Sequence, residues 1–345
     1  MKRMRFCAAV LACLIAQPAL AQMRQDDAAV LSEAEAAAAV EASHSSISAY
    51  GAWLLRLNKV IEPAIGGLRG MQGKWQEMSR APSPATAGKL LRPALAGVKA
   101  RIVASIADLK ALDRPDVSAL ELDADIQPDA LVAQTLTLLK QFHSLVDTMD
   151  GVAGAMIAGD VKAAEVGAKE IFVAARLIYD TQTTLTNAFL ATAAPDRAEY
   201  DSLLIEKTFF AIGSRVILAA ERIAKTQPDA SLPMDLDRFA AELDQIAARG
   251  RGRVVTELAY LEEQQARDYV SDDAHRILAK AIAVTASQRD AFAVAERFAA
   301  DIRLKAAGLR KARTPQAVFG LAGLLAPARQ QLDQVAIQQA AIMAQ

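Results

Sequence analysis

The sequence predicts an all-α protein in which long amphipathic helices form one or two antiparallel helical bundles. Apolar residues recur at the helical period over long segments. No stretch alternates apolar and polar residues between hairpin turn signals, as strands would. Glycine and proline are few and fall between the periodic segments. The chain is longer than one hydrophobic core usually holds, so we expect one large domain or two smaller ones.

Residues 1–21 have the order of a secretory signal peptide. A basic start (residues 2–5) is followed by an apolar run (residues 6–15) and an A-x-A cleavage site that ends at Ala21. The apolar run is too short to span a bilayer, which takes roughly 20 residues. We therefore expect cleavage after Ala21 and a periplasmic or secreted protein that begins at Gln22.

Both cysteines, Cys7 and Cys13, lie inside this signal. As an alternative, Cys13 would be the lipidated first residue of a lipoprotein, but the apolar stretch before it is short and the A-x-A site would then have no purpose. Cleavage after Ala21 leaves no cysteine, which excludes disulfides, thiolate metal sites and cysteine nucleophiles. Removing three of the 39 basic residues leaves 36 against 40 acidic ones, a net charge of −4. The mature protein therefore lacks the basic excess typical of nucleic-acid binding.

The N-terminal unit, residues 22–112, contains two expected helices. The first runs from about residue 26 to Pro63; it is alanine-rich at first and then carries an apolar stripe with Trp53 as a core anchor. Proline removes a helix hydrogen bond, so we expect a kink or a restart at Pro63. The second helix covers residues 89–112.

Two proline-bearing stretches are the expected linkers. Residues 113–129 are acidic, but they lack the spacing and the central glycine of a calcium-binding EF-hand loop, so we expect a solvated linker. Residues 226–236 form the second linker. The linkers set off a central helical bundle, residues 130–225, and a C-terminal helical segment, residues 237–345.

Inside the central bundle, residues 150–160 read DGVAGAMIAGD, and three glycines disfavour a helix here. We interpret the stretch as a tight helix–helix connection. The alternative is a membrane-seeking hairpin tip in which Val152, Met156 and Ile157 contact lipid. Nine residues between two aspartates cannot span a bilayer, and no basic face flanks them to hold anionic lipid, so the connection is favoured.

Residues 248–253, ARGRGR, form the most definable polar patch of the chain. If a helix begins here, Arg249, Arg251 and Arg253 together with free backbone N–H groups suit a phosphate, a carboxylate or an acidic partner. The alternative is a helix C-terminus closed by glycine, where positive charge is favourable.

Catalytic motifs are missing: the sequence has no H-E-x-x-H, no G-x-S-x-G and no phosphate-binding glycine loop. One metal pattern is left, because an E-x-x-H ends at His44 and a D-x-x-H ends at His275, with Glu206 and Glu257 as further donors. Dinuclear metal bundles use such pairs. The E-x-x-H pattern is a common chance match, so we rank a di-metal enzyme third and expect no metal and no cofactor.

The leading hypothesis is an exported, non-enzymatic helical-bundle protein of the bacterial cell envelope. It would act by protein–protein interaction, in an accessory or scaffold role, because amphipathic helices are ready interaction surfaces. The expected partner is an envelope protein and not nucleic acid. The second hypothesis is a carrier of lipid or another apolar ligand, or a membrane-active protein. The oligomeric state is left open.

Overall fold

The computed structural model describes residues 33–118, 120, 122, 124–225, 227, 229–266, 272–311 and 315–344. Within these ranges the chain forms eight α-helices and one short 3-10 helix and has no strand, which confirms the all-α prediction. The expected signal peptide, with Cys7, Cys13 and Ala21, lies outside the described residues. The helices are α2 (Glu33–Ser79), α3 (Pro84–Ala111), η1 (Ala124–Ile126), α4 (Pro128–Ala158), α5 (Val161–Thr192), α6 (Ala198–Ala224), α7 (Leu232–Gln265), α8 (Asp272–Lys311) and α9 (Pro315–Ala344).

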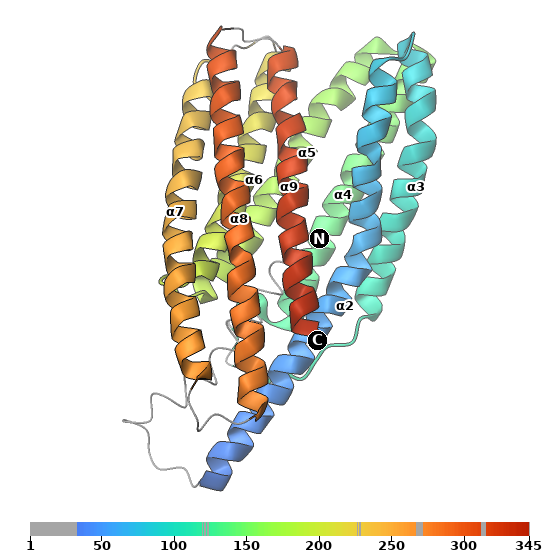
Figure 1. The fold of residues 1–345 in the computed structure, drawn as a ribbon. Helices are drawn as coiled ribbons and strands as arrows, with labels where there is room; N and C mark the ends of the chain where they lie inside the picture. Colours follow the sequence, from blue (N-terminus) through green and yellow to red (C-terminus); the bar gives the residue numbers. More distant parts are fainter. Residues whose placement is uncertain are drawn as a thin grey trace.

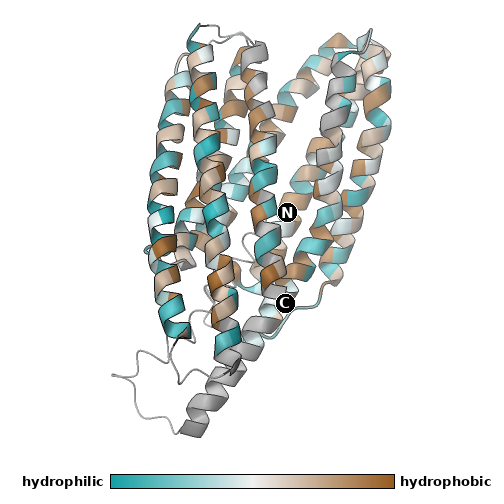
Figure 2. Cartoon of the chain, in the orientation of Figure 1, coloured by the Kyte–Doolittle hydropathy of each residue, from teal (hydrophilic) through white to brown (hydrophobic). Residues whose placement is uncertain are grey.

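The helices stand in two antiparallel groups, side by side (Figure 1). One group holds α2, α3 and α4, and the other holds α6, α7, α8 and α9; α5 packs against both α4 and α6 and so joins the groups. Most turns between consecutive helices are short, and short turns force neighbouring helices to run antiparallel. Figure 2 shows apolar and polar residues alternating around the helices, as amphipathic helices require.

The first group buries an apolar cluster in which Tyr50 and Trp53 of α2 are fully enclosed. Their rings stack with centroids 5.8 Å apart. The expected restart at Pro63 is wrong, because α2 continues through it to Ser79. Pro63 lies on the exposed face, where solvent can satisfy the carbonyl that loses its helix hydrogen bond, while Ile61 and Ala64 beside it stay buried.

The stretch 113–129 is less solvated than its composition predicts. Ile126 is 3% exposed, and its backbone carbonyl accepts a hydrogen bond of 2.7 Å from the Tyr50 hydroxyl. Val117 and Leu120 also pack against the first cluster. Since the buried hydroxyl needs an acceptor, this segment closes the core of the first group in addition to linking α3 to α4.

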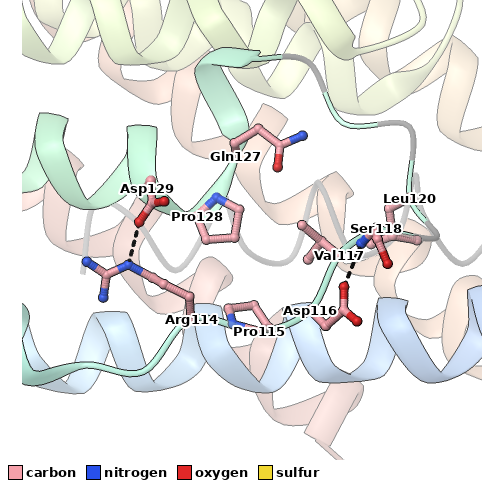
Figure 3. A pocket seen from close by; sticks show the side chains of 9 residues that line it. All are labelled: Arg114, Pro115, Asp116, Val117, Ser118, Leu120, Gln127, Pro128 and Asp129. Carbon is pink, nitrogen blue, oxygen red and sulfur yellow. Dashed lines mark hydrogen bonds and ion pairs between the residues drawn. The ribbon is translucent and has the colours of Figure 1, made fainter.

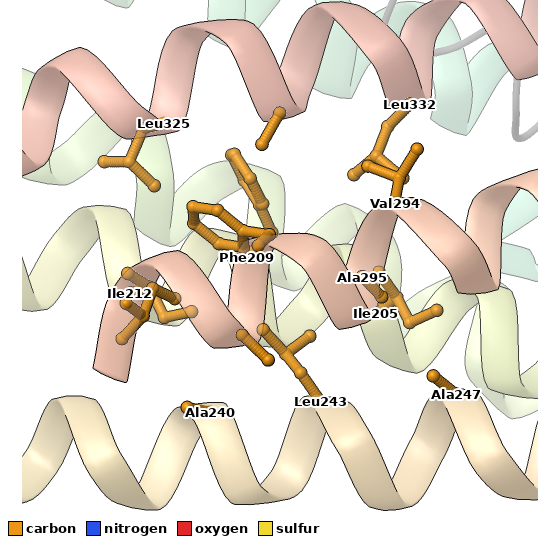
Figure 4. Close-up of a cluster of buried hydrophobic side chains, with 14 of the residues drawn as sticks. Ile205, Phe209, Ile212, Ala240, Leu243, Ala247, Val294, Ala295, Leu325 and Leu332 are labelled. Atoms are coloured by element: carbon orange, nitrogen blue, oxygen red, sulfur yellow. The ribbon is translucent and has the colours of Figure 1, made fainter. Parts of the chain in front are cut away.

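The second group encloses the larger cluster, in which residues from all four of its helices meet (Figure 4). Phe209 of α6 and Phe298 of α8 are both buried in it, with ring centroids 5.0 Å apart. Small residues of α7, such as Ala240 and Ala247, are fully buried and let the helices approach closely. The residues labelled in Figure 4 are Ile205, Phe209, Ile212, Ala240, Leu243, Ala247, Val294, Ala295, Leu325 and Leu332.

The two large clusters do not follow the predicted central unit, residues 130–225. Its first helix, α4, belongs to the first cluster and its last, α6, mainly to the second. α5 contributes to both, with Ile178 and Phe189 in the first cluster and Phe172 packed against the second. The domain boundaries drawn from the linkers stay a prediction.

Candidate functional site

The arginines of residues 248–253 lie in the interior of α7 and not at a helix end. α7 runs without interruption from Leu232 to Gln265, so both the expected helix start and the expected glycine-closed C-terminus are wrong here. The backbone N–H groups of this stretch are therefore used inside the helix. Only the guanidinium groups can act on a ligand, and each of them has a partner within the chain.

Arg249 and Arg253 hold the carboxylate of Asp201, in the first turn of α6. Arg249 donates to Oδ1 from Nε at 2.8 Å and from Nη2 at 2.6 Å, and Arg253 donates from Nη1 to Oδ2 at 2.9 Å. The Asp201 side chain has no exposed surface. A buried charge needs such paired and hydrogen-bonded partners. We call this arrangement the Asp201 clamp; it fastens α7 to the start of α6.

Glu257, one turn beyond the clamp, caps the same end of α6. Its Oε1 accepts a hydrogen bond of 2.7 Å from the backbone N–H of Ala198, the first residue of α6. Negative charge at a helix N-terminus is stabilising. Burial raises the pKa of the Glu257 carboxyl, and the hydrogen bond from Ala198 opposes that shift. The sequence analysis considered Glu257 as a metal donor. In the structure its carboxylate caps the N-terminus of α6 instead.

The third arginine, Arg251, points to the other neighbour of α7. Its guanidinium pairs with the Glu296 carboxylate of α8. An incoming anion would have to compete with Asp201 and Glu296 for these three arginines. The stretch thus ties α7 to α6 on one side and to α8 on the other, and anion or partner binding by it stays a prediction.

Val152, Met156 and Ile157 lie in the last turns of α4, all half-buried. A Cβ built on Gly88 of α3 would touch Met156 and Ile157, and one built on Gly167 of α5 would meet Val152. These residues therefore pack between helices. The glycines disfavour an isolated helix, but α4 continues to Ala158 because tertiary packing outweighs weak intrinsic propensity. The connection expected over residues 150–160 is therefore shorter than predicted.

The connection itself is only the pair Gly159 and Asp160. Gly159 adopts φ +73°, a left-handed conformation that suits glycine. The Asp160 carboxylate accepts a hydrogen bond of 2.9 Å from the backbone N–H of Ala163 and so caps α5. No described helix is both long and apolar enough to cross a membrane. Membrane contact by Val152, Met156 and Ile157 stays a prediction.

The residues of the di-metal hypothesis serve other contacts where they can be described. Glu206 of α6 forms a buried ion pair with Arg329 of α9, and His275 of α8 is half-buried. The side chain of His44 lies outside the described ones. Among the described residues, no group of three or more His, Cys, Asp and Glu side chains is placed to hold a metal ion.

The ion pair between Glu206 and Arg329 was not predicted from the sequence. Arg329 Nη1 lies 3.2 Å from Glu206 Oε1, and both side chains are at most 10% exposed. The guanidinium carbon also lies 5.4 Å from the centre of the Phe210 ring, a cation–π contact. Burial raises the pKa of nearby Tyr179, and the positive charge of Arg329 opposes the shift. The signal was available, since Arg329 and Asp333 are the two charged residues of residues 315–344.

A shallow pocket of about 430 Å³ lies where the stretch 113–129 turns over the first group (Figure 3). Arg114 Nε donates to Asp129 Oδ1 at 2.9 Å, and Asp116 Oδ1 accepts from the backbone N–H of Ser118 at 2.9 Å. The hydrogen bonds from Ser118 lower the pKa of the exposed Asp116 carboxyl. The charged side chains of the pocket are thus used within the segment, Arg114 and Asp129 by each other and Asp116 by the backbone of Ser118.

Comparison with known proteins gave no match: no protein-family model matches the chain, and no curated protein or solved structure is detectably similar to it.

Proposed function

We propose that this protein is exported to the cell envelope and acts, without catalysis of its own, by binding another protein through an exposed helix face. The order of basic, apolar and A-x-A segments within residues 1–21 supports export. The long amphipathic helices and their outward faces support binding.

The observation that carries the proposal is where the exposed apolar side chains lie. Nine large apolar residues of the described part of the chain are exposed, and four of them are on α5: Val161, Val166, Val173 and Leu177. Val166, Val173 and Leu177 are spaced by seven and four residues and so share one face of α5. Single exposed apolar residues need no explanation, but several on one helix face mark an interaction site.

A pull-down from envelope extracts with the mature chain tests the proposal. We expect a protein that is recovered at stoichiometric level by the wild type and lost with the double variant Val173→Glu/Leu177→Glu. The matched control is Val255→Glu/Leu304→Glu, because these residues are 60% and 72% exposed on α7 and α8. No specific protein, or equal recovery with both variants, would overturn the proposal.

Flotation with liposomes examines the membrane-active alternative with the same two variants. Flotation that the α5 variant abolishes and the control variant keeps would replace the protein partner with a lipid surface.

A further inference from the structure

The two ends of the molecule differ in charge. At the upper end in Figure 1, α2 turns into α3, α4 into α5, α6 into α7 and α8 into α9; the other three connections lie at the lower end. Over each connection and the eight residues on either side of it, the described side chains of the upper end comprise ten basic and seven acidic groups, a net charge of +3. Those of the lower end comprise four basic and ten acidic groups, a net charge of −6. Charge is thus separated along the long axis of the bundle.

Five basic residues of the upper end are exposed and have no acidic partner in the described part of the chain. The other five pair with carboxylates of the same end. Of the described acidic residues there, Asp160 and Glu165 stay outside ion pairs, and Asp160 caps α5. Unpaired positive charge therefore exceeds unpaired negative charge at this end. We call the five unpaired basic residues the tip cations: Arg80, Lys89, Lys162, Lys305 and Lys311.

The upper end also presents exposed apolar side chains. Val161, the first residue of α5, is 68% exposed, and Met234, in the first turn of α7, is 67% exposed. Leu90 of α3 and Leu304 of α8 are exposed at the same end. Among the described residues, no large apolar side chain is exposed within eight residues of a lower connection. Basic and exposed apolar residues on one surface are the composition of sites that lie on a membrane.

We propose that the upper end docks onto a membrane surface that contains anionic lipid, so that the bundle stands upright with its acidic end away from the lipid. The tip cations then lie among the lipid phosphates, and Val161 and Met234 enter the boundary between head groups and acyl chains. An anionic surface attracts the positive end and repels the negative one, which selects this orientation over the reverse. The inference goes beyond the proposed function, because it leaves the outward side chains Val173 and Leu177 of α5 free for a protein.

The tertiary structure assembles this surface from distant segments. Along the sequence, no basic face flanks residues 150–160. In the fold, the turn between α2 and α3 and the end of α8 bring Arg80 and Lys311 to the same end as Lys162. The surface is therefore a property of the bundle and not of one helix.

Flotation of the purified mature protein tests the proposal, with vesicles of phosphatidylcholine and phosphatidylglycerol compared with vesicles of phosphatidylcholine alone. We expect binding to the anionic vesicles that weakens as salt rises, and no binding to the neutral ones. Each basic residue near an anionic surface strengthens binding about fivefold. The variant Arg80→Gln/Lys162→Gln/Lys311→Gln should therefore lower the partition coefficient roughly a hundredfold.

The matched control is Arg56→Gln/Lys110→Gln/Lys140→Gln. It removes the same charge from exposed residues that have no ion pair in the described chain and lie outside the upper end. This control should keep most of the binding, because the charges it removes lie far from the lipid. Circular dichroism of every variant verifies that it is folded.

The apolar contribution has its own pair of variants. Val161→Ser/Met234→Ser should lower the partition coefficient roughly tenfold by removing apolar surface from the contact. Val103→Ser/Val255→Ser should leave it unchanged, because these residues are 50% and 60% exposed but lie away from the upper end.

A dye that brightens in lipid reports the orientation, since the mature chain expected from cleavage after Ala21 has no cysteine of its own. On Ala230→Cys, an exposed position between α6 and α7, the dye should brighten when anionic vesicles are added. On Ala194→Cys, exposed between α5 and α6 at the lower end, it should not.

No flotation with anionic vesicles would refute the docking, and so would equal flotation with neutral ones. Equal losses with the two triple variants, or a dye response at Ala194→Cys in place of Ala230→Cys, would refute the assignment to the upper end. A pull-down that recovers an envelope protein while flotation fails leaves the proposed function standing without this inference. Flotation that Val173→Glu/Leu177→Glu keeps, together with a failed pull-down, removes the protein partner and keeps the inference.

Discussion

Gly250 and Gly252 belong to the same short stretch of α7, and we expect alanine to shift stability in opposite directions at the two positions. Gly250 is buried against the Phe292 ring of α8. A Cβ built on Gly250 would lie 2.9 Å from Cδ1 of that ring and closer still to Cε1 and Cζ. A Cβ built on Gly252 meets nothing within 4 Å.

The magnitudes follow from two opposing effects. Alanine is favoured over glycine in a helix interior by about 1 kcal/mol, and this gain applies at both positions. Only Gly250→Ala must also displace Phe292, which is fully buried, and such overpacking costs about 1–3 kcal/mol. We therefore expect Gly252→Ala to stabilise by up to about 1 kcal/mol. Gly250→Ala should be less stable than Gly252→Ala by about 1–3 kcal/mol.

Urea unfolding followed by far-UV circular dichroism measures the difference, with equal denaturant slopes as the condition for comparing the two variants. The control is the double variant Gly250→Ala/Phe292→Leu. Its leucine side chain is smaller than phenylalanine and makes room for the new Cβ, so this variant should recover part of the stability that Gly250→Ala loses. Gly250→Ala as stable as Gly252→Ala would refute the close packing of α7 on α8 at this point.

Three more predictions use the same unfolding measurement. Gly88→Ala should destabilise the first group by about 1–3 kcal/mol, because its Cβ would lie 2.6 Å from the backbone oxygen of Ala153 on α4. Gly97→Ala on the same helix has open space around its Cβ and should not destabilise the protein. Equal effects of the two variants would contradict the contact between Gly88 and α4. Hydrogen bonds from Arg215 and Ser231 lower the pKa of Asp229 from 3.8 to about 2. The ionised carboxylate therefore adds about 2 kcal/mol to the free energy of unfolding above pH 3.8, and this contribution is lost as the pH falls towards 2. An acid unfolding curve that Asp229→Asn leaves unchanged would contradict this prediction. Arg329→Met should cost about 3–5 kcal/mol by leaving Glu206 buried without its ion pair, and Arg329→Met/Glu206→Leu should recover most of that loss; no recovery would contradict the pairing.

The local sequence pattern predicted the helical class correctly, but its predicted helix boundaries were wrong at three places. α5 begins at Val161, directly after the stretch that the sequence analysis interpreted as a helix–helix connection, and the Asp160 side chain caps its first turn. The restart expected as one alternative at Pro63 is absent, and so are the connection expected over residues 150–158 and the helix end expected within residues 248–253, because α2, α4 and α7 continue there. Propensity is a weak prior, and packing on neighbouring helices overrides it.

The candidate sites were harder to predict because their chemistry depends on partners far away in the sequence. Arg249 and Asp201 are 48 residues apart, so the ARGRGR segment considered alone does not indicate that its arginines bind the Asp201 carboxylate. Similarly, Glu206 was considered as a metal donor in the third-ranked hypothesis, whereas its carboxylate pairs with Arg329 on the last helix. An arginine-rich stretch looks the same in sequence whether its charges face solvent or a buried aspartate.

The sequence by itself determined the helical class, the amphipathic faces and the absence of any recognisable catalytic motif, since each depends only on residue type and spacing along the chain. The tertiary structure alone decided that the arginines of α7 fasten helices together and that the apolar end of α4, residues 150–158, is packed between helices. It also decided that Val166, Val173 and Leu177 of α5 face outward. Those outcomes depend on which helix lies beside which. That choice is made by packing the whole set of apolar faces together, and no single segment contains it.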